Sequence, residues 1–253
     1  MLLVLDVGNT NTVVGLVEGL DVRETFRIRT APRTTDELGM LLLGLLKQRG
    51  VEPSVLTGAI CGSVVPSVLY GIEKACRRYL SVEPLFVGRG LKTGMKVRTD
   101  NPREVGADRI VNAVAALDRF GGPVVVVDFG TATTLDCINS RGEYVGGAIA
   151  PGLRVSEEAL FERTAQLPRV EVAKPPSAIG RNTRHAMQSG LFYGYAGLVD
   201  ALARRCRDEL DGQATVVATG GLARLISSEC SAIDEVDTFL TLRGLAMLYA
   251  RNT

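Results

Sequence analysis

Hydrophobic residues along this chain alternate between short apolar runs and longer apolar stretches flanked by helix-end signals. The runs at 2–5 and 124–127 consist of Leu and Val, which is typical of strands buried on both faces. The pattern predicts strands at 2–7, 12–18, 22–28, 56–64, 85–87, 124–128, 133–138, 143–149 and 215–218. It predicts helices at 34–50, 66–80, 101–120, 152–164 and 184–210, a short helix after 221, and a terminal helix at 241–251. Strands alternate with helices in both halves, so the fold class is α/β.

The predicted helices carry recognisable signals at their ends. Thr34-Thr35-Asp36-Glu37 forms a capping-box pattern, with Glu three residues after Thr. Pro66 and Asn101-Pro102 place a proline in a first helical turn. The segment 88–99 is rich in Gly and Lys and lacks apolar periodicity, so we expect an exposed loop there.

One phrase occurs twice in the sequence. Asp6-Val7-Gly8-Asn9-Thr10-Asn11-Thr12 follows the first apolar run, and Asp128-Phe129-Gly130-Thr131-Ala132-Thr133-Thr134 follows its counterpart 122 positions later. The repetition predicts two pseudo-equivalent domains, 1–121 and 122–253, with the terminal helix packed on the first. Phe120-Gly121-Gly122-Pro123 provides the break between them.

Net charge and hydropathy exclude several classes of partner. The chain has 253 residues, with 29 basic and 28 acidic side chains and a net charge of +1. This balance favours neither nucleic acid nor a membrane surface as a partner. No apolar run approaches the roughly 20 residues needed to span a bilayer, and no signal peptide is evident. We therefore expect a cytoplasmic protein.

The cysteines and the single histidine limit the chemistry further. Five cysteines lie far apart without a Cys-x-x-Cys pattern, which favours reduced, buried thiols in the cytosol. His185 is the only histidine, so a site built from several histidines is excluded.

Both copies of the repeated phrase place an acid at the end of a buried strand. Ligands of open α/β sheets bind beyond the carboxyl ends of strands, and glycine lets the backbone approach a phosphate. Asp6 and Asp128 are therefore candidates for holding a metal ion beside phosphate; capping of the glycine turn is the alternative. The chain contains neither a P-loop motif nor the Gly-x-Gly-x-x-Gly of a dinucleotide-binding domain.

Three further segments are candidates for substrate binding. Asp108 and Arg109 follow Gly106-Ala107 near a helix start, where the acid either accepts a proton or merely complements the helix dipole. Thr219-Gly220-Gly221 follows a strand and lets the backbone lie against an adenosine, or is simply a strand exit. Gly180-Arg181-Asn182-Thr183 opens a long helix and either binds an anion or caps that helix.

Taken in order, these motifs resemble those of the type III pantothenate kinases, a family within the superfamily of acetate and sugar kinases, heat-shock chaperones and actin. The likeness covers essentially the whole chain. It includes Asn101-Pro102-Arg103-Glu104-Val105-Gly106-Ala107-Asp108-Arg109, Gly146-Gly147 with Pro151-Gly152, and Ala218-Thr219-Gly220-Gly221. The resemblance implies two ribonuclease-H-like domains with a nucleotide cleft between them, and ATP-dependent phosphorylation of pantothenate to 4′-phosphopantothenate, the first step of coenzyme A biosynthesis.

The resemblance also implies roles for individual residues. Asp108 is the expected general base, and Asp128 the expected ligand of a monovalent cation, K⁺ or NH₄⁺. Asp6 is expected to serve the Mg²⁺–ATP complex. Together with Asp6, the residues expected to contact ATP are Val7, Gly8, Asn9, Thr10, Asn11, Thr12, Val13, Thr131, Gly220 and Gly221. The pantothenate contacts are expected from Thr99, Gly106, Ala107, Asp108, Arg109 and Thr183.

The family's assembly and one departure from its pattern complete the expectations. Members are homodimers whose substrate pocket lies at the dimer interface, so we expect a homodimer. Thr99 stands where many members carry a substrate-contacting Tyr, which leaves pantothenate affinity open. Two alternatives also stay open: another small-molecule kinase of the superfamily, and a kinase-like regulator without turnover.

Overall fold

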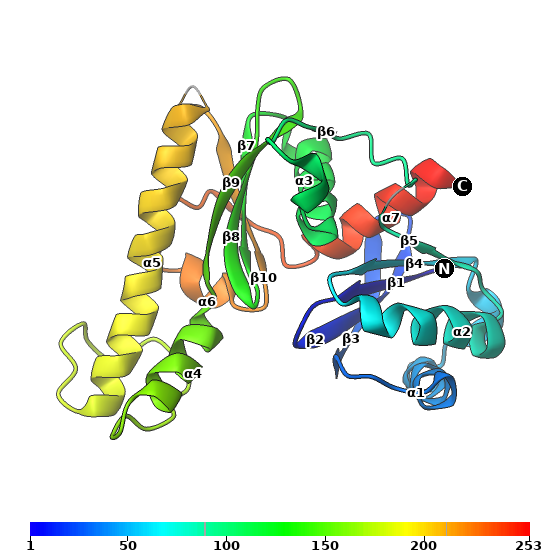
Figure 1. The fold of residues 1–253 in the computed structure, drawn as a ribbon, viewed down its shortest axis with the longest axis horizontal. Helices are drawn as coiled ribbons and strands as arrows, with labels where there is room; N and C mark the ends of the chain where they lie inside the picture. The colour runs from blue at the N-terminus through cyan, green and yellow to red at the C-terminus, as the bar shows by residue number, and fades with distance from the viewer. Residues whose placement is uncertain (89, 211) are drawn as a thin grey trace. The chain divides into compact units, whose positions relative to one another are not determined.

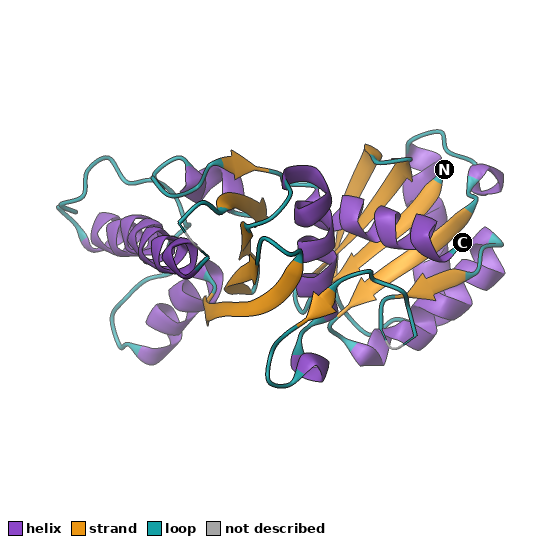
Figure 2. Ribbon diagram, turned by 90° about the horizontal axis from the view of Figure 1, so that it is seen from above, coloured by secondary structure: helices purple, strands orange, loops and turns teal. Residues whose placement is uncertain are grey.

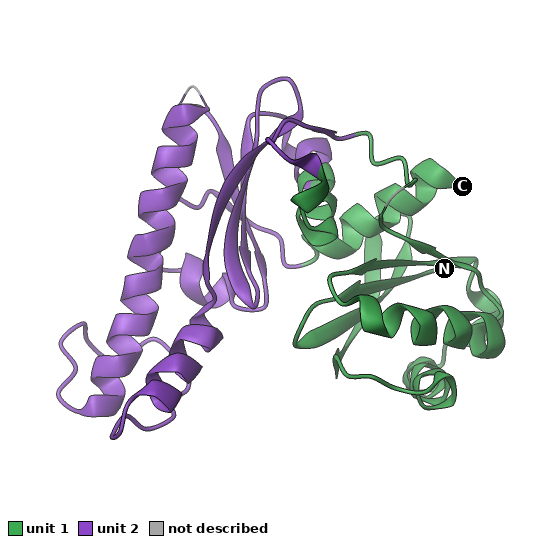
Figure 3. Cartoon of the chain, viewed as in Figure 1, with its two compact units in different colours: residues 1–94, 103–115, 239–253 green, residues 95–102, 116–238 purple. Residues whose placement is uncertain are grey.

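The computed structural model describes residues 1–88, 90–210 and 212–253. The chain divides into two compact units (Figure 3). Unit 1 comprises Met1–Gly94, Arg103–Ala115 and Phe239–Thr253; unit 2 comprises Met95–Pro102 and Ala116–Thr238. Because each unit is assembled from separate segments, a single domain border at residue 121 stays a prediction. Arg89, inside the expected loop 88–99, lies outside the described residues.

The sheet of unit 1 has the strand order β3-β2-β1-β4-β5 (Figure 1). β2 is antiparallel to both β1 and β3, whereas β4 is parallel to β1 and β5 is parallel to β4. The strands are β1 (Leu2–Val7), β2 (Asn11–Glu18), β3 (Asp21–Arg29), β4 (Gly58–Ser63) and β5 (Pro84–Phe86). The first four residues of β1 are buried, as the continuous apolar run predicts.

Helices cover both faces of this sheet. α1 (Thr35–Gln48) and α2 (Leu69–Leu80) pack on one face, and their side chains form a single core with those of the strands. Leu38, Leu42 and Leu46 lie four residues apart and so share one face of α1, which is buried in that core. α7 (Leu240–Asn252) packs on β1, β2 and β4. A Cβ at Gly15 would lie 3.0 Å from Leu242 Cδ1, so glycine lets this helix approach the sheet.

The sheet of unit 2 has the order β11-β10-β7-β8-β9-β6. Its strands are β6 (Lys96–Val97), β7 (Val124–Phe129), β8 (Ala132–Ile138), β9 (Glu143–Pro151), β10 (Thr215–Gly220) and β11 (Glu235–Val236). With β6 set aside, the order and the strand directions are those of unit 1. The expectation that the second half repeats the plan of the first is confirmed.

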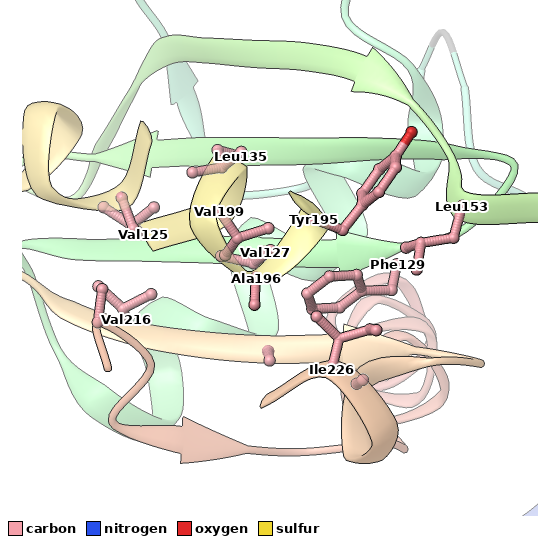
Figure 4. Close-up of a cluster of buried hydrophobic side chains, with 14 of the residues drawn as sticks. Val125, Val127, Phe129, Leu135, Leu153, Tyr195, Ala196, Val199, Val216 and Ile226 are labelled. Atoms are coloured by element: carbon pink, nitrogen blue, oxygen red, sulfur yellow. The ribbon is translucent and has the colours of Figure 1, made fainter. Parts of the chain in front are cut away.

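Unit 2 contains the helices α4 (Leu153–Arg163), α5 (Thr183–Glu209) and α6 (Ala223–Ser227), whereas α3 (Ala107–Phe120) begins in unit 1 and only its last residues belong to unit 2. In the core of unit 2, Val125 and Val127 of β7 lie beside Ala196 and Val199 of α5 (Figure 4). Figure 2 shows helices against strands in both units, the layering of an α/β fold. Within the described residues, no helix has both the length and the apolar character that crossing a membrane requires.

The predicted elements are present, with differences at their ends. The capping box exists: Glu37 N donates to Thr34 Oγ1 at 3.2 Å, and Thr34 N donates to Glu37 Oε2 at 2.8 Å. Contrary to our expectation, Pro102 does not open α3; it begins a separate 3₁₀ turn, η3 (Pro102–Glu104). Pro66 likewise begins a 3₁₀ turn, η2 (Pro66–Val68), and α2 starts only at Leu69, not at Pro66 as we expected; η1 (Pro53–Val55) also begins with proline.

The expectation of an exposed loop at 88–99 was partly wrong. β6 lies inside this segment and pairs with β9, and Met95 is buried. β6 and β11 are two residues long, too short to show any periodicity in the sequence. Their pairing partners define them.

Candidate functional site

The first hairpin places Asp6 one residue before the end of β1. Asp6 is half-buried; it lies opposite Val13 of β2 and beside Gly62 of β4. Three residues, 8–10, separate the two strands, and Gly8 N donates to Asn11 O at 3.0 Å to close the turn. Thr10 O accepts from Thr30 N at 3.0 Å, which ties the turn to the chain beyond β3.

The second hairpin places Asp128 in the corresponding position of β7. Asp128 is half-buried, lying opposite Thr134 of β8 and beside Thr219 of β10. Only residues 130–131 separate the strands, and Gly130 N donates to Ala132 O at 3.0 Å. The second turn is therefore one residue shorter than the first.

Glycines let the backbone close around Asp128. Gly220 has φ +94°, and a Cβ there would lie 2.5 Å from Asp128 Oδ1 and 2.7 Å from Phe129 N. Gly152 N donates to Thr131 O at 3.0 Å, and a Cβ at Gly152 would lie 2.3 Å from the same oxygen. Both contacts are shorter than side chains tolerate, so this packing requires glycine. Gly220 therefore lets backbone lie against the Asp128 carboxylate, and Gly152 lets backbone lie against the turn that follows Asp128; these two contacts are called the glycine shell of Asp128 below.

The shorter second turn changes which residues correspond. The strands β2 and β8 share the burial pattern intermediate, buried, intermediate, buried when Asn11 is matched with Ala132. Thr12 therefore corresponds to Thr133, 121 positions on, and not to Thr134 as the repeat in the sequence indicates. Thr12 Oγ1 shares a hydrogen bond of 2.8 Å with Thr30 Oγ1. Thr133 Oγ1 is buried and has no hydrogen-bond partner among the described residues.

The expected general base lies at the start of α3 in unit 1. Asp108 is the second residue of the helix and is half-buried; its Oδ1 accepts from Arg109 N at 2.9 Å. A Cβ at Gly106 would lie 2.5 Å from that same carboxylate oxygen, so Gly106 leaves room for it. Acid in a first helical turn is favoured by the free N–H groups and the helix dipole. Gly106, Ala107, Asp108 and Arg109 are thus brought together.

Contacts with α7 hold this helix start in place. Thr241 Oγ1 donates to Asn112 Oδ1 at 2.7 Å, one turn beyond Asp108. A Cβ at Gly244 would lie 2.3 Å from Val111 O, so α3 and α7 touch backbone to backbone. The terminal helix therefore supports both the sheet and the segment that carries Asp108.

Thr99 belongs to unit 2, where an ion pair fixes its segment. Arg98 N donates to Tyr144 O at 2.8 Å, and its guanidinium pairs with Glu143 Oε1 at 3.1 Å. Hydrogen bonds from Asn139 and from Arg98 lower the pKa of Glu143. Thr99 Oγ1 is buried without a hydrogen-bond partner among the described residues. An unpartnered buried hydroxyl is costly, so a substrate group that bonded it would gain affinity.

The remaining expected contacts lie at element ends of unit 2. Thr183 is the first residue of α5 and is exposed; Asn182 caps the helix by accepting from His185 N at 2.9 Å. Gly220 ends β10, and Gly221 follows it. Asp128, Thr131 and Gly220 thus form one cluster with Gly152, whereas Thr99 lies beside β9 and Thr183 at the start of α5.

Sequence reasoning overlooked two contributors to this arrangement. The Arg98–Glu143 pair joins residues 45 positions apart and carries no local pattern. Gly152 was visible as part of a motif, but its closeness to Thr131 was not. Asp6 to Val13 and Gly106 to Arg109 belong to unit 1, and Thr99, Asp128, Thr131, Thr183, Gly220 and Gly221 to unit 2.

Comparison with known proteins gives consistent results. The family profile described as "Type III pantothenate kinase" matches residues 2–205. A protein of Myxococcus xanthus (strain DK1622) named "Type III pantothenate kinase" is 54% identical over 253 residues, which cover 100% of this chain and 99% of that protein.

Solved structures of similar fold have much lower identity. One, a protein from Campylobacter jejuni described as a Baf family transcriptional activator, has a TM-score of 0.61 at 18% identity, over 99% of this chain and 98% of that one. An inorganic polyphosphate/ATP-glucomannokinase from Arthrobacter sp. strain KM has a TM-score of 0.52 at 15% identity, over 100% and 99%. These likenesses show the fold, a two-domain α/β fold shared with sugar kinases.

Proposed function

Because this chain belongs to the type III pantothenate kinase family, we propose that it transfers the γ-phosphoryl group of ATP to the primary hydroxyl of pantothenate. The product is 4′-phosphopantothenate, and the reaction is the first step of coenzyme A biosynthesis. The observation that carries the proposal is the family match over residues 2–205 together with the two strand-end carboxylates, Asp6 and Asp128, in equivalent hairpins. We place the reaction in the cytoplasm, and the expectation of reduced, buried cysteines supports this.

The two carboxylates suit oxygen-preferring cations. Mg²⁺ is usually held by one or two carboxylates together with substrate phosphates, and Asp6 offers one half-buried carboxylate beside the first glycine turn. Asp128 offers another within its glycine shell, which fits a monovalent cation, K⁺ or NH₄⁺. Bound cations would neutralise the charge of the transferred phosphoryl group. The backbone of 8–13 and of Thr131, with Gly220 and Gly221, would contact ATP.

Asp108 would accept the proton of the pantothenate hydroxyl. Its carboxylate lies at a helix start whose position α7 fixes, and this favours a constant distance to the bound alcohol. Arg109 would bind substrate oxygens, with Gly106 and Ala107 allowing a close approach. Thr99 and Thr183 would complete the pantothenate contacts, and the unpartnered hydroxyl of Thr99 supports its part in them.

We propose that the active form is a homodimer, and one exposed surface supports this. Val145 and Ile149 both belong to β9, and both side chains are exposed, Ile149 at 67%. A second copy of the chain would cover them. Ile149→Asp should then give monomers by light scattering, whereas Met40→Asp, at an exposed position of α1, should leave the dimer intact.

A coupled ADP-release assay tests the reaction. The wild-type protein should turn over with pantothenate and not with acetate or with a panel of sugars. Activity with a sugar alone would indicate another kinase of the superfamily, and nucleotide binding without any turnover would indicate a regulator.

Asp108→Asn sharpens the test. The amide keeps the shape but accepts no proton, so kcat should fall by about 10²–10⁴-fold, with ATP affinity little changed. Asp118→Asn, at an exposed acid of the same helix, is the control. Retention of more than about a tenth of wild-type kcat by Asp108→Asn would remove Asp108 from the role of base.

A further inference from the structure

A buried carboxylate of unit 2, Asp136, has no part in the roles assigned above. It lies in β8 and is 0% exposed. Its Oδ1 accepts from Tyr144 Oη at 2.7 Å, and its Oδ2 accepts from Thr134 Oγ1 at 3.2 Å. Tyr144 is also fully buried, whereas Thr134 is half-buried. Removing a carboxylate from water costs several kcal/mol, so a gain in stability does not explain why the core holds Asp136.

The first hairpin has no such polar side chains at the equivalent positions. When β2 is matched with β8 at a separation of 121 positions, Val13 corresponds to Thr134 and Gly15 to Asp136. In unit 1, the second of these positions serves helix packing, because Leu242 of α7 lies against Gly15. The hydroxyl and the carboxylate of β8 are therefore particular to the second hairpin and are not required by the architecture that the two units share.

Thr134 lies directly opposite Asp128 in the pairing of β7 with β8. Directly opposed residues of an antiparallel pair share one face of the sheet, with Cβ atoms about 4.5–5.5 Å apart. The Thr134 hydroxyl and the Asp128 carboxylate are thus neighbours, at the end of β7 where Gly220 lies against Asp128. Asp136 belongs to the same face, two residues farther along β8.

The hydrogen bond to Asp136 determines what the Thr134 hydroxyl can do. A threonine hydroxyl has one proton to donate and two lone pairs that accept. The proton is given to Asp136, and among the described residues no donor bonds the Thr134 oxygen. This oxygen is therefore an acceptor beside the carboxylate of Asp128. Oxygen lone pairs are what K⁺ binds and what NH₄⁺ donates hydrogen bonds to.

We propose that Thr134 is a second oxygen ligand of the monovalent cation at Asp128, and that Asp136, held by Tyr144, positions the Thr134 hydroxyl for it. The proposal rests on the proposed function, which places that cation at Asp128. Asp136 acts through Thr134, by keeping the hydroxyl proton directed away from the cation. Tyr144 binds the other oxygen of Asp136 and so restrains rotation of the carboxylate.

Nucleotide affinity tests the proposal without turnover. Isothermal titration calorimetry should show that Mg²⁺–ADP binds the wild-type protein more tightly in KCl than in NaCl of equal ionic strength, because a cation at Asp128 offsets the phosphate charge. Thr134→Val keeps the shape of the side chain and removes its oxygen, so the difference between the two salts should disappear. Thr134→Ser keeps the hydroxyl and should retain the difference.

Asp136→Asn separates the positioning of the hydroxyl from its presence. With the amide oxygen bound by Tyr144, the amide nitrogen faces Thr134 and donates to its oxygen, which directs the threonine proton outward. In the ADP-release assay, the KCl concentration that gives half the maximal rate should rise about 10–100-fold, the usual effect of losing a group that orients a metal ligand. At saturating KCl the rate should return close to that of the wild type. Tyr144→Phe keeps the carboxylate and should cause a smaller rise.

Thr215→Val is the matched control. Thr215 is half-buried like Thr134, but it begins β10, whereas Gly220, which lies against Asp128, ends that strand. This variant should keep the wild-type response to potassium. An unchanged response in Thr134→Val, or an equal loss in Thr134→Val and Thr215→Val, would overturn the proposal.

The wild-type protein separates this proposal from the proposed function. Equal Mg²⁺–ADP affinity in KCl and NaCl would overturn the assignment of Thr134 as a cation ligand, even if pantothenate is phosphorylated. A potassium-dependent ADP affinity that disappears in Thr134→Val, in a protein that does not phosphorylate pantothenate, would count against the proposed function alone.

Discussion

The hairpin β1–β2 and the hairpin β7–β8 are two versions of one structure. The first strand of each has the same burial pattern, with a half-buried aspartate next to last, and a glycine opens each turn. Each aspartate lies between an antiparallel and a parallel neighbour. The equivalent position in each sheet thus leaves both aspartates half-buried near the end of their strands.

The hairpins differ in the length of the turn and in the residue that ties the turn to the rest of the unit. The first turn has three residues and the second has two. Equivalent residues of β2 and β8 are therefore separated by 121 positions, whereas those of β1 and β7 are separated by 122. In unit 1, the backbone N–H of Thr30 donates to Thr10 of the turn, and its hydroxyl shares a hydrogen bond with Thr12. In unit 2, Gly152 takes the place of Thr30, and its N–H donates to Thr131 of the turn. Because Gly152 has no hydroxyl, Thr133 is left unpartnered.

The difference between the two turns fits the two roles that we propose for the repeated motif. The first hairpin keeps a longer turn with polar side chains, which suits contacts with phosphate. The second gives up a residue and packs glycines around its aspartate, which suits a fixed shell around a cation. The repeat therefore keeps the positions of the carboxylates, while the turns decide what surrounds them.

Removing either carboxylate should have the largest effect and should separate the two roles. Asp6→Asn and Asp128→Asn should each lower kcat by about 100-fold or more, since each weakens the binding of a cation that offsets the negative charge of the phosphates. In Asp128→Asn alone, the residual rate should no longer be higher in K⁺ than in Na⁺. Rates measured in both salts across a Mg²⁺ titration decide the matter. An equal potassium response in the two variants would make the hairpins functionally alike.

Substitutions beside the two aspartates should show that the surroundings of Asp128 require glycine, whereas those of Asp6 do not. Gly220 and Ser63 occupy the same place relative to the hairpins, as the parallel neighbours of Phe129 and Val7. Gly220→Ala should lower the free energy of unfolding by about 3 kcal/mol, because φ is +94° and the new Cβ meets backbone. Ser63→Ala should lower the free energy of unfolding by only about 1 kcal/mol, because it removes the hydrogen bond that Ser63 Oγ accepts from Val65 N. Urea unfolding measures both free energies. A loss of about 1 kcal/mol or less in Gly220→Ala would argue against rigid packing around Asp128.

The smallest expected effect is on stability, where equivalent threonine substitutions in the two hairpins should change the free energy of unfolding in opposite directions. Thr133→Val removes a buried hydroxyl without a partner and should stabilise the protein by about 1 kcal/mol. Thr12→Val breaks the bond to Thr30 and should destabilise it by a similar amount, about 1 kcal/mol. The two unfolding curves, compared with the wild type, provide the check. If both variants are destabilised equally, a partner for Thr133 exists and the correspondence is wrong.

Most elements of this fold were predictable because their signals are local. Strand periodicity, the capping box at Thr34 and the prolines of the turns each act within a few residues. The two-residue strands β6 and β11 were not predictable, because pairing partners distant in sequence create them. Pro66 and Pro102 were assigned to α-helices for a different reason, since a first-turn proline suits a 3₁₀ turn as well as an α-helix.

The candidate site divides in the same way. The sequence alone determined which residues are chemically competent, Asp6, Asp108 and Asp128 among them, since acid, glycine and strand end are all visible in the letters. Tertiary structure decided the one-residue difference between the turns and the close approach of α7 to the sheet of unit 1 at Gly15. These depend on register and on helix-to-sheet packing, which are fixed by the fit of whole surfaces and leave no trace in neighbouring residues.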